Sequence, residues 1–317
     1  MFRTALSHLT LRQLRAFEAV ARHASFTAAA EALHITQPTL SMQIKKLADA
    51  VGGPVFEQVG RRIHLTDLGE ELLKTSREIR QSLERLDMAV AELQGVERGT
   101  LRLTGVTTSE YFAPRVLGAF RQRHPGIAVS LNVTNRAMVL QRLAENRDDL
   151  YIIGQPPEGD ELVCEPFLDN PLVVLAAPDH PLARRPGIPL SELQGELFLL
   201  REPGSGTRNA VETYLRAQGL ELDQIMELGS NEAIKQAAIA GMGIAVLSQY
   251  ALAHEVAHGE LAILDVEGFP LAHHWYVAYP RGKRFSVVAR AFYDYLFEEG
   301  RRIARSALTD PLDAHHV

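Results

Sequence analysis

The stretch AAEALHITQPTLSMQIKKL, residues 29–47, decides the fold of the N-terminal part of the chain. Small alanines lead into a short break, after which Leu40, Ile44 and Leu47 recur at i, i+4 and i+7. Pro38 suits the first turn of this second helix, because its missing N–H has no partner there. Two helices that cross closely around alanines are typical of a helix-turn-helix.

The flanking residues complete a winged form of this motif. Residues 9–23 read as an amphipathic helix, Ser25 stands at an N-cap position, and Gly52–Gly53–Pro54 ends the second helix. VFEQVGRRIHLT then predicts a β-hairpin wing. We therefore predict a winged helix-turn-helix DNA-binding domain over residues 9–66. The alternative is an alanine-rich helical hairpin within an enzyme.

The predicted DNA-binding residues lie at the helix starts, on the exposed side of the second helix and at the wing tip. Thr, Ser and Gln suit base edges and phosphates, Lys suits the phosphate backbone, and two arginines can enter or flank a minor groove. The expected contacts with double-stranded promoter DNA come from Ser25, Thr36, Gln37, Pro38, Thr39, Ser41, Met42, Lys45, Lys46, Arg61 and Arg62.

The charge distribution agrees with this division of the chain. The net charge is −6, yet residues 1–66 hold eight Lys/Arg against four Asp/Glu, whereas residues 99–317 hold 20 against 27. A basic head on an acidic body favours contact of the head alone with phosphate, although the excess is modest. With 46% hydrophobic and 23% charged residues, the composition is that of a globular protein.

A long helix is expected after the wing, over residues 67–95. An apolar stripe recurs at heptad spacing, with Ser76 as a weak member, and a narrow stripe on so long a helix requires a partner. Two-fold pairing would present two heads to a palindromic site; the alternative is packing on the body of the same chain. Residues 96–99 are the predicted hinge. The predicted dimerisation residues are Leu72, Ile79, Leu83, Leu86, Val90 and Leu93.

The body alternates strand and helix patterns from residue 100 onward, which predicts parallel sheets covered by helices. The chain is expected to form one lobe from residues 100–168 and 269–302 and a second lobe from residues 169–268. Two α/β lobes joined by two crossings form a cleft, and ligands bind at the carboxyl ends of strands in such sheets.

The loops that follow these strands are the predicted effector site. Gly204 and Gly206 allow close backbone approach, and the helix that opens there favours an anion. The alternative for each loop is simple helix capping. The predicted residues are Thr107, Thr108, Ser109, Asn135, Arg136, Gln155, Ser205, Gly206, Thr207, Arg208, Ser230 and Asn231. A small anionic metabolite carrying a phosphate or carboxylate is the expected ligand.

The runs AAEALHITQPTLSMQIKKL and VGGPVFEQVGRRIHLTDLG resemble the DNA-binding domain of LysR-type transcriptional regulators, apart from Ala48 and Gln58. The runs LQRLAENRDDLYIIGQPP, REPGSGTRNAVE and GSNEAIKQAAIAGMGIAVLS resemble, more narrowly, the regulators of Calvin-cycle (RuBisCO) operons. This resemblance implies a periplasmic-binding-protein-like effector domain and a dimer of dimers at promoters of carbon-fixation genes. It also implies an allosteric repressor-activator, not an enzyme, with a phosphorylated sugar, a nucleotide or NADPH as non-covalent effector.

Other signals are weaker. Gly241-Met-Gly243 ends a helix and so is a poor dinucleotide motif, and His254 and His258 lack a third metal ligand nearby. Cys164 is the only cysteine, and the sequence shows neither a membrane span nor a secretory signal, so we expect a cytoplasmic protein. Two rivals stay open: a LysR-type regulator of aromatic or amino-acid metabolism, and a solute-binding or enzyme-like α/β protein.

Overall fold

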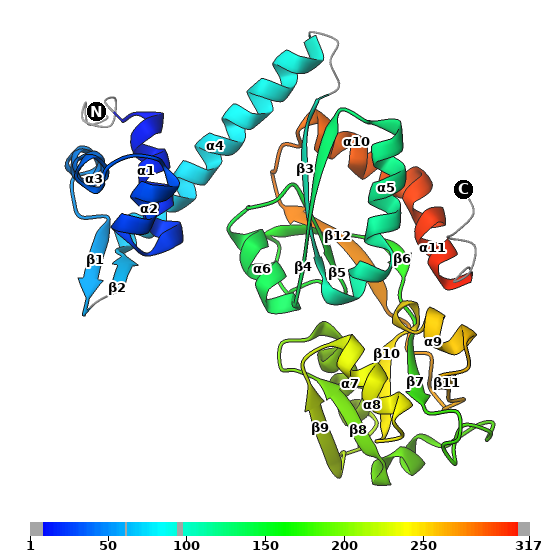
Figure 1. Ribbon diagram of the computed structural model, residues 1–317. Coiled ribbons are helices and arrows are strands. Elements are labelled where there is room, and N and C mark those ends of the chain that lie inside the picture. Colours follow the sequence, from blue (N-terminus) through cyan, green and yellow to red (C-terminus); the bar gives the residue numbers. More distant parts are fainter. Residues whose placement is uncertain (1–8, 61, 94–97, 310–317) are drawn as a thin grey trace. The chain divides into compact units, whose positions relative to one another are not determined.

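The computed structural model describes residues 9–60, 62–93 and 98–309. The chain divides into two compact units, residues 1–87 and 88–317. Figure 1 shows helices and a hairpin in the first unit and sheets covered by helices in the second. Within the described residues, no helix is both long enough and apolar enough to cross a bilayer.

The first unit is a three-helix domain with a hairpin. Its elements are α1 (Leu11–His23), α2 (Phe26–Ala32), α3 (Gln37–Val51), β1 (Phe56–Val59), β2 (Arg62–Leu65) and the start of α4 (Asp67–Leu93). Local signals set the helix ends: Thr10 forms a capping box with Gln13, Ser25 caps α2, and Gly52 ends α3 at a φ of 89°. The predicted stripe of α3 is buried with Phe17 and Val20 of α1 in one core.

Gly69 fixes how α4 begins. A β-carbon at this position would lie 2.1 Å from the carbonyl oxygen of Val55. The helix therefore starts directly against the segment that precedes the hairpin, which only glycine permits. Thr66 adds a cap, because its side chain accepts a hydrogen bond from the N–H of Gly69 at 3.0 Å.

The second unit contains two five-stranded sheets, and we call each sheet with its helices a lobe. The first lobe has strand order β4-β3-β5-β12-β6, and the second has β11-β7-β10-β8-β9. In chain order the elements are β3 (Gly99–Val106), η2 (Thr107–Tyr111), α5 (Ala113–Arg123), β4 (Ile127–Thr134), α6 (Arg136–Ala144), β5 (Leu150–Ile153), β6 (Leu162–Asp169), β7 (Leu172–Ala176), η3 (Leu190–Gly195), β8 (Leu197–Arg201), α7 (Gly206–Ala217), β9 (Gln224–Leu228), α8 (Asn231–Ile239), β10 (Ile244–Ser248), η4 (Gln249–Ala251), α9 (Ala253–Ala257), β11 (Ala262–Ile263), β12 (His274–Pro280), α10 (Val287–Tyr295), η5 (Leu296–Gly300) and α11 (Arg301–Thr309).

The predicted parallel pairing is confirmed for β3 with β4 and β5, and for β8 with β9 and β10. It is wrong where the chain crosses between the lobes. β12 pairs antiparallel with β5 and β6, and β7 pairs antiparallel with β10 and β11. The sheets are mixed because β6 runs on into β7 and β11 leads back to β12, so these strands do not follow the strand–helix–strand repeat.

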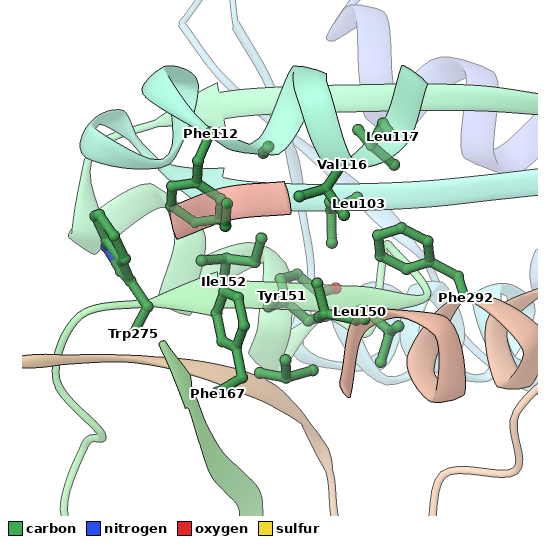
Figure 2. Packing of buried hydrophobic residues seen from close by; sticks show 14 of the residues in the cluster. Leu103, Phe112, Val116, Leu117, Leu150, Tyr151, Ile152, Phe167, Trp275 and Phe292 are labelled. Carbon is green, nitrogen blue, oxygen red and sulfur yellow. The ribbon is translucent and has the colours of Figure 1, made fainter. Parts of the chain in front are cut away.

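The core of the first lobe extends to the junction with the second lobe (Figure 2). Trp275, the only tryptophan of the chain, is fully buried on β12. Its ring centroid lies 4.4 Å from that of Phe112 and 4.7 Å from that of Tyr250, which belongs to η4 after the last long strand of the second lobe. Aromatic packing therefore joins the lobes near the crossing strands.

Candidate DNA-binding surface and effector cleft

The surface of α3 opposite its core stripe carries the predicted DNA-reading side chains. Gln37, Pro38, Met42, Lys45 and Lys46 are exposed. Thr36 is exposed as well, whereas Thr39 and Ser41 are partly buried. Hydrogen bonds order the helix start: the hydroxyls of Thr36 and Thr39 lie 2.7 Å apart, and Nε2 of Gln37 donates to Oγ of Ser41 at 3.1 Å. This surface can present donors and acceptors to base edges and positive charge to phosphates.

The wing is an antiparallel hairpin of two four-residue strands, β1 and β2. Val59 pairs with Arg62 beside Gly60, whose φ is 63°, and Arg62 is exposed. Arg61, the other predicted wing contact, lies outside the described residues. Ser25 has a structural role at the start of α2, because its Oγ accepts from the N–H of Ala28 at 3.3 Å. Its hydroxyl proton is still able to donate to a phosphate.

The apolar stripe of α4 divides into two parts. Leu72 is 9% exposed and packs in the core of the first unit, which corrects its assignment to a dimer interface. Ser76 is also buried, and its Oγ donates to Oε1 of Glu18 on α1 at 2.7 Å. Heptad spacing alone could not separate these contacts within the chain from the rest of the stripe.

The remaining described members of the stripe are Ile79, Leu83, Leu86 and Val90, and all are 37–58% exposed. The side chain of Leu93 is not among those described. A groove of about 650 Å³ lies between α1 and α4 and includes Leu11, Ile79 and Leu83. An apolar stripe that continues into such a groove is typical of a surface for a partner helix.

The predicted effector cleft lies between the carboxyl ends of strands from both lobes. The loop 204–206 of the second lobe meets the start of α6 in the first: a β-carbon on Gly206 would lie 3.5 Å from Cδ of Arg136. Nη2 of Arg136 donates to the carbonyl of Gln155 at 3.3 Å, while its Nε is buried without a hydrogen-bond partner within the described residues. The structure thus brings these predicted residues together.

A cavity of about 590 Å³ continues from this point toward the second crossing. It is lined by Gln155, by Ala210 and Tyr214 of α7, and by residues 270–274 with His273 among them. Burial lowers the pKa of His273, and the neighbouring imidazole of His274 lowers it further. The volume lies within the range of small-molecule sites, roughly 300–1,000 Å³.

Arg201, at the end of β8, is the cationic residue that sequence reasoning missed. Its side chain is 2% exposed, and Nη1 donates to Oγ1 of Thr107 in the first lobe at 3.3 Å and to Oδ1 of Asn231. Nε and Nη2 donate to the two carboxylate oxygens of Glu202 at 2.7 and 2.9 Å. The available signal was an arginine that ends the apolar run LFLLR at the cleft edge.

Arg208, the predicted anion ligand on α7, forms ion pairs with Glu212 of α7 and Glu227 of β9. Nε lies 2.7 Å from Glu212, and Nη1 lies 2.8 Å from Glu227 and donates to the carbonyl of Arg201 at 2.9 Å. The two carboxylates raise the pKa of Arg208 above its usual value. These contacts engage Nε and Nη1 of Arg208 within the second lobe, and its role as an anion ligand stays a prediction.

Several other predicted effector residues act as helix caps. Asn135, Ser205 and Ser230 accept hydrogen bonds from the N–H groups of Met138, Arg208 and Ala233, respectively. Helix capping was the open alternative, and these contacts match it. Thr207 is partly exposed beside them on the first turn of α7.

Of the three residues after β3, only Thr107 contacts the second lobe in a described hydrogen bond. Thr108 is 5% exposed. Ser109 is fully buried, and its Oγ donates to the carbonyl of Val106 at 2.6 Å. Ser109 therefore holds the turn at the strand end, which corrects its assignment as a ligand contact.

No candidate metal site accompanies the cleft. His254 and His258 stack with ring centroids 4.2 Å apart, but the described part of the chain has no group of three or more potential metal ligands. Cys164 is partly buried, and burial raises the pKa of its thiol.

A winged helix-turn-helix and a two-lobed α/β domain with a polar cleft define the class of ligand-responsive transcriptional regulators. Residues 11–70 match the family model described as "Bacterial regulatory helix-turn-helix protein, lysR family", and residues 94–301 match "LysR substrate binding domain". The chain belongs to the LysR family of transcriptional regulators and is not an enzyme.

The relatives place it within one group of that family. It is 48% identical to the HTH-type transcriptional activator CmpR of Synechocystis sp., over 94% of this chain and 98% of that protein. It is 51% identical to the RuBisCO operon transcriptional regulator of Acidithiobacillus ferrooxidans, over 92% and 95% of the two chains. The solved CcmR regulatory domain of Synechocystis in complex with 2-PG is 52% identical, with a TM-score of 0.61, and the match covers 63% of this chain and 96% of that one.

Proposed function

We propose that this regulator controls carbon-fixation genes and responds to a small anionic metabolite bound between the lobes of its effector domain. The observation that carries the proposal is the pair of cleft arginines, Arg136 and Arg201, one from each lobe. The names of the relatives supply the class of target gene, since one of them is a RuBisCO operon transcriptional regulator.

The effector is proposed to be a phosphorylated anion. Arg136 offers a buried Nε donor, Arg201 offers a buried guanidinium, and Thr107 and Asn231 stand beside Arg201. Charged donors in a partly dry site favour an anion that can bridge them. The ligand of the related CcmR domain, 2-PG, is the first molecule to test, followed by phosphorylated sugars and NADPH.

DNA recognition is proposed to use the exposed side of α3 and the wing. Gln37, Ser41 and Met42 would read base edges, whereas Lys45 and Lys46 would contact phosphates. Removing one phosphate contact lowers the slope of log K against log salt by about one. Lys46→Ala should therefore weaken binding to all sequences alike and reduce that slope.

Assembly is proposed to be two-fold at the level of α4 and then a dimer of dimers. Ile79, Leu83, Leu86 and Val90 leave an apolar stripe open to a second copy. In this arrangement residues 9–66 form the DNA-binding domain, residues 67–95 the linker and residues 96–99 the hinge. Residues 100–168 with 269–302, and residues 169–268, form the two effector lobes. Because its target is chromosomal DNA, we place the protein in the cytoplasm.

The deciding experiment measures binding of the full-length protein to its own upstream promoter by fluorescence anisotropy, across salt and with 2-PG, phosphorylated sugars and NADPH. Selective, salt-sensitive binding that one anion shifts is the expected result. Selective binding without a response to any of these anions would remove the effector from the proposal. A response to an aromatic compound or an amino acid would favour the alternative, a LysR-type regulator of another pathway.

A further inference from the structure

The donor fork of Arg201 is already occupied by a carboxylate of the same chain. Glu202 accepts from Nε at 2.7 Å and from Nη2 at 2.9 Å, a two-point contact. Neighbouring side chains within a strand point to opposite faces. Glu202 can reach its neighbour because β8 ends at Arg201 and the chain turns there toward α7.

The other guanidinium donors are also engaged. Nη1 donates to Thr107 and Asn231, so four of the five N–H groups of Arg201 have protein acceptors. An anion that binds Arg201 through this fork must displace a group that is already present. Glu202 is the group able to leave, because its side chain is 23% exposed whereas that of Arg201 is 2% exposed.

We propose that Glu202 is an internal competitor that holds Arg201 until an effector displaces it, and that it thereby sets effector affinity. This inference rests on the proposed function, in which the cleft binds an anion. The carboxylate is tethered one residue away, so its effective concentration at the fork is very high. A ligand with a single carboxylate offers no more than Glu202 itself does, whereas a multiply charged anion can also engage Arg136.

The contrasting role for Glu202 is purely structural: it would neutralise a buried guanidinium and keep it in place. The two roles predict opposite changes in anion affinity. Removal of a competitor strengthens binding, whereas removal of a support lets Arg201 move and weakens binding.

The test is calorimetric titration of wild type, Glu202→Gln and Glu192→Gln with 2-PG and with acetate. Glu192 is a matched control, because it also makes a two-point contact with an arginine, accepting from Nη1 and Nη2 of Arg185 at 2.6 and 3.0 Å on an exposed part of the second lobe. We expect Glu202→Gln to bind 2-PG roughly tenfold more tightly, or about 1.4 kcal/mol. Acetate, weak for wild type, should gain by a similar factor, because both ligands must displace the same carboxylate. Glu192→Gln should match wild type.

Unchanged or weaker binding of both ligands by Glu202→Gln, with promoter binding intact, would overturn the inference. If that variant unfolds, Glu202→Asp serves instead. Its shorter side chain keeps the charge but cannot span the two donors of Arg201. Tighter binding of 2-PG by this variant supports competition, and weaker binding refutes it. Failure of the proposed function looks different: wild type would then bind neither 2-PG nor the other anions of the promoter experiment.

Discussion

Replacing Arg201 should damage effector binding far more than replacing Arg208. Arg201→Gln removes a guanidinium that is 2% exposed, and a hydrogen bond to a charged group contributes about 1.5–3 kcal/mol. The dissociation constant for the effector should therefore rise roughly 10- to 150-fold. Arg208 is 17% exposed, and its carboxylate partners are 33% and 52% exposed. These ion pairs lie within the second lobe, so Arg208→Gln should leave effector affinity within about twofold.

Tryptophan fluorescence offers a direct assay for both variants. Trp275 is the only tryptophan and packs against Phe112 and Tyr250 at the lobe junction, so a change in lobe packing should alter its emission. Titration with 2-PG gives the dissociation constant, and circular dichroism with promoter binding controls for folding. An Arg208→Gln loss equal to or larger than that of Arg201→Gln would refute the assignment of Arg201 and restore the sequence-based one.

Three further perturbations test other parts of the molecule. Gly69→Ala places a β-carbon 2.1 Å from the carbonyl oxygen of Val55, so we expect a loss of about 1–3 kcal/mol and a lower melting temperature of the DNA-binding unit; an unchanged melting temperature would contradict the contact. Leu86→Asp puts a charge in the exposed stripe of α4 and should yield smaller species in sedimentation, whereas Lys74→Asp on the opposite side of the helix should not. His273 has a lowered pKa in the folded protein, so unfolding takes up protons and stability should fall as pH drops through the unfolded value near 6.5. The free energy of unfolding, measured with denaturant at pH 8 and pH 6, should differ less between the two pH values in His273→Gln than in wild type. An equal difference in both proteins would refute the role of His273 in this pH dependence.

Local patterns in the sequence predicted the head well. The spacing of Leu40, Ile44 and Leu47 gave the buried side of α3, and Ser25 and Gly52 marked helix ends, because each signal acts within one or two turns. Leu72 was misassigned because it belongs to the heptad stripe, yet a neighbouring helix covers it.

The effector cleft was only partly predictable. The loops at the carboxyl ends of the strands were found, but the choice between Arg201 and Arg208 depends on partners far away in the sequence. Arg208 pairs with Glu227, which lies 19 residues away in the sequence, whereas Arg201 contacts Thr107, which lies 94 residues away. These partners decide which guanidinium meets the other lobe. The antiparallel strands were missed for a similar reason, since pairing across a crossing leaves no local periodicity.

The position of β12 has a consequence for synthesis on the ribosome. β12 lies between β5 and β6 in the first sheet, and it is the strand with which β6 pairs. About a hundred residues separate the two strands. At a translation rate of 5–20 residues per second, β12 is therefore synthesised roughly 5–20 s after β6. The second sheet, drawn from contiguous residues 172–263, emerges whole in that interval. During this interval the nascent chain carries a complete second lobe, while in the first lobe the edges of β5 and β6 that pair with β12 are still open. Chaperone protection therefore matters most at this stage.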